Sequence, residues 1–266
     1  MPRITLNRTD HYYEDTGGED QAILFIHGLF FDGRMFAEQV AALKGQYRCV
    51  SLDWRSQGRS EVAAFGHDGD GLVSDAKALI EVLELGPCHI VGVSVGGVLA
   101  IRLAAQYPEL IKSIVGIGSS GQCETIETLT RYEAIMSAFA REGPACVIDT
   151  LMPLIFGPKF NTAPEMAESF AHWKAHILAN DGPAVGRAAA PILRRVDISH
   201  MFEHVKCPAL FVVGEDDHVN GVEKAEHIIA GIEGAKVRIM PETGHTPPIE
   251  SPHELAQVLA EFYAGQ

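Results

Sequence analysis

The sequence predicts an α/β protein in which a mostly parallel sheet is flanked by helices, and two observations lead to this fold class. Short apolar runs, most of them rich in valine and isoleucine, are typical of strands buried on both faces of a parallel sheet. These runs are residues 22–26, 47–52, 89–93, 111–117, 209–213 and 236–240. Helical patterns alternate with them at residues 34–44, 72–85, 95–107, 222–232 and 253–263. Such alternation indicates βαβ units and therefore parallel strands.

Prolines and the N-terminal segment complete this order of elements. Pro87, Pro108 and Pro208 stand where a helix stops or a strand is about to begin, as expected for a residue that breaks regular structure. Ahead of the first buried run, residues 9–16 predict an edge strand or two.

One long segment interrupts the alternation. From Gln122 to about Val205 there is no convincing strand, and amphipathic helices are predicted instead near residues 124–141, 144–156, 163–180 and 182–195. About eighty residues are too many for a loop, so the segment is either a second domain or a lid over the carboxyl edge of the sheet. We predict the second arrangement: a single domain of residues 1–266, with a core at 1–121 and 206–266 and a helical lid at 122–205.

Composition limits the partners that the protein can bind. The 266 residues include 21 basic and 35 acidic side chains, which gives a formal net charge of −14. A nucleic-acid partner would require a basic face, and the acidic balance also disfavours anionic membranes, so we expect neither partner. A hydrophobic fraction of 47% with 21% charged residues is typical of a globular protein with a sizeable core.

Cysteine usage and the apolar segments predict a cytoplasmic location. The five cysteines form no C-x-x-C pair, which fits a reducing compartment better than a disulfide framework. The first eighteen residues contain no apolar signal core. The longest apolar stretch, near residues 90–105, is interrupted by glycines, Ser94 and Arg102, so it does not predict a membrane span.

The run Ile-Val-Gly-Val-Ser-Val-Gly-Gly-Val at residues 90–98 places a single hydroxyl, that of Ser94, among apolar residues and glycines. A strand followed by G-x-S-x-G and then a helix is the context of a nucleophile elbow. Glycines two residues before and after the serine remove Cβ atoms that would clash in so tight a turn. The turn would present Ser94 at the sheet edge, beside the Val95 amide at a helix N-terminus, where an oxyanion could be stabilised.

A nucleophilic serine needs a base, and the base needs an acid that orients it. The run at 209–213 is followed by Gly-Glu-Asp-Asp at 214–217, and the last run is followed by Glu-Thr-Gly-His at 242–245. Both segments lie just past the carboxyl end of a predicted strand, where the sites of open α/β sheets are found. The order serine, acid, histidine is that of elbow-type hydrolases. We therefore expect Ser94, an aspartate at 216 or 217, and His245 to act together.

Further motifs make the chain resemble the α/β-hydrolase fold superfamily. Phe25-Ile26-His27-Gly28-Leu29 resembles its strand followed by HG, and residues 53–60 (DWRSQGRS) resemble its D-x-R-G-x-G-x-S turn, with Ser56 in place of the first glycine. Residues 214–217 match G-x-x-D, and residues 244–252 match G-H-x-x-x-x-E-x-P. Within the superfamily, the chain most resembles small soluble esterases and lactonases, such as 3-oxoadipate enol-lactonases, and cofactor-free haloperoxidases.

The resemblance implies a role for each site residue. Ser94 would be the nucleophile, His245 the base and Asp217 the acid that orients the imidazole. The amides of Val95 and Leu29 would form the oxyanion hole, with Phe30 as an alternative to Leu29. A serine nucleophile sets aside the related haloalkane dehalogenases and epoxide hydrolases, which attack with aspartate.

Other patterns are given structural interpretations. Gly116–Gly121 spells G-x-G-x-x-G but precedes the insertion, so it does not predict a dinucleotide site. The H-x-x-E-H at residues 200–204 is expected to be a surface turn, and His172 with His176 an ordinary polar helix face. The same holds for four arginines of the lid that could otherwise bind a carboxylate: Arg131, Arg187, Arg194 and Arg195. For the substrate pocket we predict Phe30, Phe139 and Trp173.

The function predicted from these observations is hydrolysis of a small-molecule carboxylic ester or lactone through an acyl-enzyme, with no metal or organic cofactor. Three other reactions on the same triad stay open: C–C bond hydrolysis, amide hydrolysis and perhydrolysis. Thr246 disfavours the first, because C–C hydrolases of this fold usually carry an aromatic residue after the histidine. Outside catalysis, the chain could be a ligand receptor built on a hydrolase scaffold. The sequence leaves the acyl group, the alcohol and the oligomeric state open.

Overall fold

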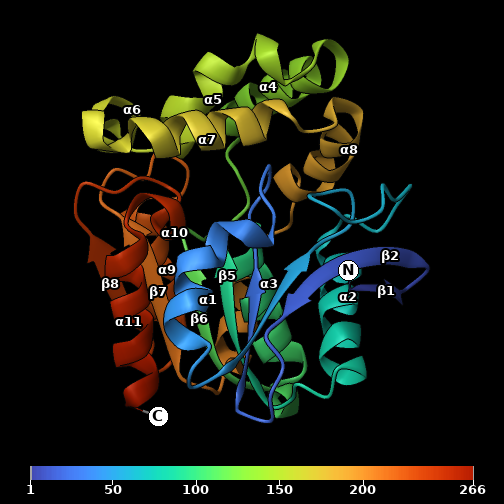
Figure 1. Ribbon diagram of the computed structural model, residues 1–266, viewed down its shortest axis with the longest axis vertical. Coiled ribbons are helices and arrows are strands. Elements are labelled where there is room, and N and C mark those ends of the chain that lie inside the picture. Colours follow the sequence, from blue (N-terminus) through green and yellow to red (C-terminus); the bar gives the residue numbers. More distant parts are fainter. Residues whose placement is uncertain (1, 266) are drawn as a thin grey trace.

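The computed structural model describes residues 2–265 and contains an eight-stranded sheet in the order β1-β2-β4-β3-β5-β6-β7-β8 (Figure 1). The strands are β1 (Arg3–Leu6), β2 (Thr9–Asp15), β3 (Ala22–Ile26), β4 (Arg48–Asp53), β5 (Cys88–Val93), β6 (Ile111–Ile117), β7 (Ala209–Gly214) and β8 (Lys236–Met240). Strands β3 to β8 are mutually parallel, and β1 and β2 add an antiparallel edge. The predicted α/β-hydrolase fold with a mostly parallel sheet is confirmed.

Helices cover both faces of this sheet, and the alternation of side chains along each strand explains how. In β3, Ile23 and Phe25 belong to one hydrophobic cluster, whereas Leu24 and Ile26 belong to the other. The first cluster packs against α1 (Ala37–Leu43) and α11 (Pro252–Ala264), and the second against α2 (Gly69–Val82), α3 (Val95–Gln106) and α9 (Val222–Gly231). Because both faces are covered, the central strands are apolar throughout, as parallel strands require.

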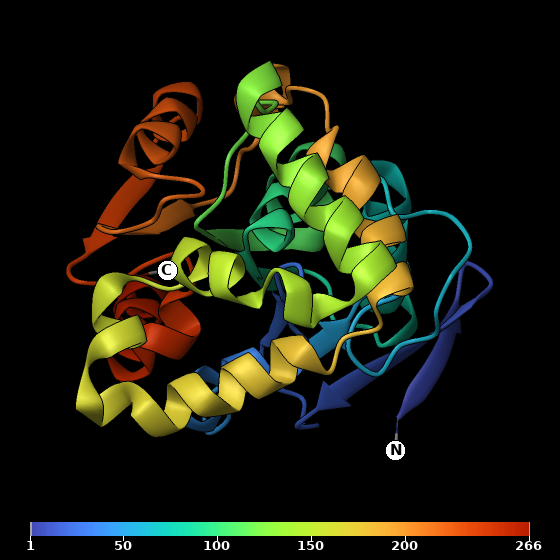
Figure 2. The same ribbon diagram turned by 90° about the horizontal axis from the view of Figure 1, so that it is seen from above.

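The lid lies across the carboxyl ends of the strands and connects β6 to β7 (Figures 1 and 2). Its α-helices are α4 (Ile126–Glu142), α5 (Ile148–Ile155), α6 (Pro158–Thr162), α7 (Ala167–Leu178) and α8 (Gly182–Leu193). Seen from above, α4 and α8 run side by side (Figure 2). Gly182 and Gly186 allow this, since a Cβ atom there would stand 2.6 Å from the Phe139 carbonyl oxygen and 2.5 Å from the Ala140 Cβ atom.

The predicted helix at residues 144–156 is instead a 3-10 turn, η3 (Pro144–Cys146), followed by α5. Likewise, the pattern at 163–180 begins as η4 (Pro164–Met166) before α7. The short helix α6 was not predicted. No helix among residues 2–265 has the length and apolar content that crossing a membrane would require.

Candidate active site

Ser94 lies at the sharp turn between β5 and α3. Its backbone has φ 54° and ψ −112°, in the positive-φ region that is costly for a residue with a side chain. Tight packing enforces this geometry, because a Cβ atom on Gly92 would lie 2.1 Å from the Gly96 carbonyl oxygen, and one on Gly96 would lie 2.1 Å from the Ile26 carbonyl oxygen. The serine amide donates to the Ile117 carbonyl oxygen (2.8 Å). The strand-turn-helix context predicted from the sequence is therefore present.

His245 and Asp217 come together at the carboxyl edge of the sheet. Nδ1 of His245 lies 2.8 Å from Oδ2 of Asp217, and both residues are buried. Oδ1 of the same carboxylate accepts hydrogen bonds from the amides of Val219 and Asn220, each at 2.8 Å. Burial raises the pKa of Asp217, but the neighbouring imidazole and these donors outweigh burial, so the pKa lies below its usual value.

The structure distinguishes the two adjacent aspartates. Asp217 contacts the imidazole, whereas Asp216 is half-buried and its amide donates to the Thr243 carbonyl oxygen (2.9 Å). Gly118 (φ 53°), in the G-x-G-x-x-G stretch, makes room for the histidine and Asp217. A Cβ atom on this glycine would stand 2.9 Å from Nδ1 of His245 and 3.0 Å from the aspartate oxygen. The role of Gly118 in that glycine pattern is therefore to leave space for the acid and the base.

A buried carboxylate holds the loop that carries the histidine. Glu250 accepts hydrogen bonds from the amides of Gly157 (2.8 Å), Gly244 (2.9 Å) and Thr246 (2.9 Å), and from the Thr246 hydroxyl (2.9 Å). Burial raises the pKa of Glu250 even though these donors favour its charged form. Gly157 belongs to the lid, and the other two donors flank His245. One side chain thus fixes the histidine loop against the lid.

The loop after β3 brings a second set of amides to the serine. The Phe30 amide donates to Oε1 of Gln57 (2.9 Å), and Nδ2 of Asn180, from the lid, donates to the Phe30 carbonyl oxygen (3.0 Å). Among the hydrogen bonds of residues 2–265, none uses the Leu29 amide. At the start of α3, the Val95 amide has no partner within the helix, as is general for the first helical residues. Sequence reasoning gave no role to Gln57, although it lies within the DWRSQGRS turn, or to Asn180, which belongs to no motif.

A cavity of about 110 Å³ brings these elements together, and its lining includes Ser94, His245, Leu29 and Val95. The lid supplies much of the wall through apolar side chains. These are Ile135, Met136, Leu151, Leu154, Ile155, Ile192 and Leu193. One part of the lining is polar and consists of Glu124, Tyr132, Arg195 and Asn220. The cavity is therefore mostly apolar, with a localised set of polar groups.

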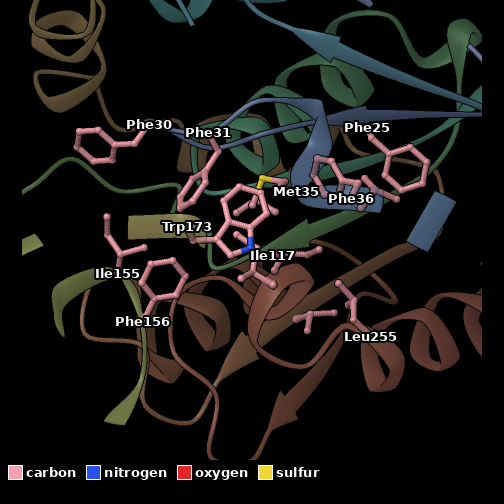
Figure 3. Packing of buried hydrophobic residues seen from close by; sticks show 14 of the residues in the cluster. Phe25, Phe30, Phe31, Met35, Phe36, Ile117, Ile155, Phe156, Trp173 and Leu255 are labelled. Atoms are coloured by element: carbon pink, nitrogen blue, oxygen red, sulfur yellow. The ribbon is translucent and has the colours of Figure 1, made fainter. Parts of the chain in front are cut away.

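Only one of the three predicted pocket residues lines the cavity. Phe30 lines the cavity, but Phe139 and Trp173 do not. Phe139 is fully buried between α4 and α8 and packs against the ring of Phe30, with ring centres 5.4 Å apart. Trp173 packs into the hydrophobic cluster beneath the lid, with its ring centre 5.6 Å from that of Phe31 (Figure 3). The structure thus places these two aromatic residues in the interior between elements rather than in the cavity lining.

Two further sequence interpretations can be compared with the structure. Arg195, expected to be a solvated arginine, lines the cavity and is mostly buried. The H-x-x-E-H stretch lies in a 3-10 helix, η5 (Ser199–His204), and its two histidines are not gathered with further ligands into a metal-binding group within residues 2–265.

The sheet order, the serine at its strained turn, and the hydrogen-bonded histidine and aspartate define an α/β hydrolase. In agreement, the model of the Alpha/beta hydrolase family matches residues 23–258, and the chain belongs to that family. Among curated proteins, it is 28% identical over 247 residues to 3-oxoadipate enol-lactonase 1 of Acinetobacter baylyi, covering 91% of this chain and 88% of that protein.

Solved structures show the same fold. A thermophilic esterase from Thermogutta terrifontis superposes with a TM-score of 0.90 at 24% identity, covering 99% of this chain and 98% of the other. The enol-lactonase from Burkholderia xenovorans LB400 gives a TM-score of 0.89 at 22% identity, covering 99% and 100%. Family membership and the enol-lactonase relative support hydrolase activity as the general class.

Proposed function

We propose that the protein is a serine hydrolase that cleaves a carboxylic ester or lactone through an acyl-enzyme, with Ser94, His245 and Asp217 as its triad. The observation that carries this proposal is the buried 2.8 Å hydrogen bond between Asp217 and His245, at a cavity that Ser94 also lines. The bond leaves Nε2 of the imidazole available to accept a proton, which a general base for serine requires.

In the proposed reaction, Oγ of Ser94 attacks the carbonyl carbon while His245 takes the hydroxyl proton. The oxyanion accepts hydrogen bonds from the amides of Leu29 and Val95. Leu29 is favoured over Phe30, because the Phe30 amide already donates to Gln57. The tetrahedral intermediate then expels the alkoxide, which receives the proton from the imidazolium. A water molecule, deprotonated by the same imidazole, attacks the acyl carbon. The second tetrahedral intermediate breaks its bond to Oγ of Ser94, which takes the proton back from the imidazolium as the acid is released.

The substrate class is inferred from the cavity and the relatives. The mostly apolar walls of the cavity suit the carbon chain of an acyl group or a lactone ring. The enol-lactonase among the relatives and the esterase among the structural neighbours support the same choice. Amide, C–C bond and peroxide chemistry use the same constellation in this fold. An amide, a β-diketone, and an ester with hydrogen peroxide as co-substrate should therefore be assayed beside the ester and lactone.

The experiment combines covalent labelling with turnover. A fluorophosphonate should label wild type at one residue, Ser94, and 4-nitrophenyl butyrate or γ-butyrolactone should be hydrolysed with repeated turnover. Ser94→Ala should lose both labelling and turnover. Residual turnover of a tenth or more in Ser94→Ala would refute the assignment of the nucleophile. If Ser94 is labelled but the protein releases only one equivalent of 4-nitrophenol from the ester and then stops, the protein is not a hydrolase with turnover. That result would favour a ligand receptor.

A further inference from the structure

The polar part of the cavity lining contains an ion cluster that the proposed catalytic steps do not use. Glu124 lies near the start of the lid, just before α4, and Arg195 follows α8, the last α-helix of the lid. Nη2 of the arginine is 2.6 Å from one oxygen of Glu124. Nζ of Lys224, from α9, is 3.3 Å from the other oxygen. The Glu124 side chain is 5% exposed, and the two cations are 19% and 20% exposed, so all three groups are largely desolvated.

This cluster contains one more cation than carboxylate. Lys224 also donates to the Val219 carbonyl oxygen and to Oδ1 of Asn220, each at 3.0 Å. The carboxylate of Asp217 is near, but it is engaged by His245 and by two backbone amides. Glu124 is therefore the only carboxylate that contacts both cations in the described part of the chain. A net positive charge beside the catalytic cavity is unexpected in a chain whose formal charge is −14.

The arginine also has unused hydrogen-bonding capacity. Nε of Arg195 is buried and has no hydrogen-bond partner among residues 2–265, and its Nη1 makes only a long contact of 3.5 Å with the Ile192 carbonyl oxygen. A buried donor without a partner is costly, and a guanidinium binds carboxylates through paired N–H groups. Tyr132 also lines the cavity, and burial together with the nearby Glu124 raises the pKa of its hydroxyl.

We propose that this cluster is a subsite for a carboxylate carried by the substrate, with Arg195 as its principal ligand, so that the enzyme prefers anionic esters or lactones to neutral ones. The proposal rests on the proposed hydrolase function, because it concerns the same cavity. A carboxylate bound there would neutralise the extra charge and supply an acceptor for the arginine. The apolar lid residues would enclose the carbon chain between this carboxylate and the scissile carbonyl.

A purely structural role is the competing explanation, because the same ion pairs tie the two ends of the lid to α9. The two roles differ in what they predict for selectivity. If the cluster only holds the lid, substitutions in it should change turnover of anionic and neutral substrates by the same factor. If it binds a carboxylate, removing the arginine and removing the glutamate should shift selectivity in opposite directions, since one lowers and the other raises the local positive charge.

The test uses substrates matched in shape. Mono-4-nitrophenyl glutarate carries a carboxylate where 4-nitrophenyl 5-methylhexanoate carries an isopropyl group, and 4-acetoxybenzoate is compared with its methyl ester to place the charge in the leaving group. For at least one pair, we expect wild type to favour the anion in kcat/KM. Arg195→Gln should lower this preference about ten- to a hundred-fold, as expected for losing a hydrogen-bonded ion pair. Glu124→Gln should raise it.

Arg194→Gln is the matched control. Arg194 precedes the proposed ligand, pairs with Glu133 of α4 at 2.5 Å and does not line this cavity, so the preference should stay unchanged. Equal losses on both members of each pair, or no preference in wild type, would overturn the subsite. If no ester is hydrolysed, the proposed function fails separately. The subsite is then judged by calorimetric titration of glutarate into wild type and Arg195→Gln, where equal binding or none in both proteins overturns it.

Discussion

Replacing Asp217 by asparagine tests the proposed triad, because it changes which ring nitrogen of His245 carries the proton. Oδ1 of the carboxylate accepts from two backbone amides, so the amide oxygen of an asparagine would occupy that position and its NH₂ group would face the imidazole. Nδ1 of His245, 2.8 Å away, would then have to accept a hydrogen bond. The ring proton would move to Nε2, and an imidazole in that tautomer cannot take the proton of Ser94.

The size of the effect follows from this tautomer. In a serine protease the equivalent change lowered kcat by about 10⁴, and a loss of 10³ to 10⁴ corresponds to roughly 4–5.5 kcal/mol at about 1.36 kcal/mol per tenfold. We expect that range for Asp217→Asn in kcat on 4-nitrophenyl butyrate, with the folded structure checked by circular dichroism. Asp216→Asn should stay within about tenfold, because only its backbone amide is engaged. If Asp216→Asn lost this much kcat while Asp217→Asn stayed active, the reasoning would be refuted.

Two further predictions concern acid stability and the lid. Burial raises the pKa of Asp32, but Arg34 outweighs it and lowers the pKa from 3.8 to about 2. The carboxylate thus contributes stability that is present above about pH 4 and lost as the pH falls toward 2, ~2.5 kcal/mol in all. Urea unfolding should show Asp32→Asn losing less stability than wild type between pH 6 and 3, and parallel losses would contradict this. Phe139→Ala should cost about 3–5 kcal/mol of stability, whereas Met136→Ala should change kcat/KM unequally between short and long acyl esters. The reverse pattern would refute the placement of these two residues.

The buried strands could be predicted because each is specified locally. An apolar run that is covered on both faces fits only a central position in a parallel sheet, and the bounds of β3 and β6 agree with those predicted. The bounds of β8 also agree, although it is an edge strand in which three of five residues are exposed. β1 was missed because its four residues form no apolar run. Strand β1 is stabilised by its hydrogen bonds to β2, and the two strands are joined by a tight turn at Asn7 and Arg8, both of which have positive φ. The asparagine was the only sequence signal for that turn.

In the site, too, features that the local sequence specifies could be predicted, whereas features that depend on distant contacts could not. Ser94, Asp217 and His245 occupy turns whose backbone geometry depends on nearby glycines, and such turns leave motifs in the sequence. The cavity wall leaves none. Met136 and Phe139 lie three residues apart on α4, and both are apolar and buried. Only the packing of α8 and of the loop after β3 decides that one faces the cavity and the other the interior.

The buried carboxylate of Glu250 has a consequence for how the cavity can open. It holds lid residue Gly157 and both neighbours of His245 at once, and the histidine amide also donates to the Ile155 carbonyl oxygen of α5 (3.1 Å). The segment joining α5 to α6 therefore cannot lift without displacing the base. Any opening of the lid that leaves the base in place must therefore occur outside the segment that joins α5 to α6.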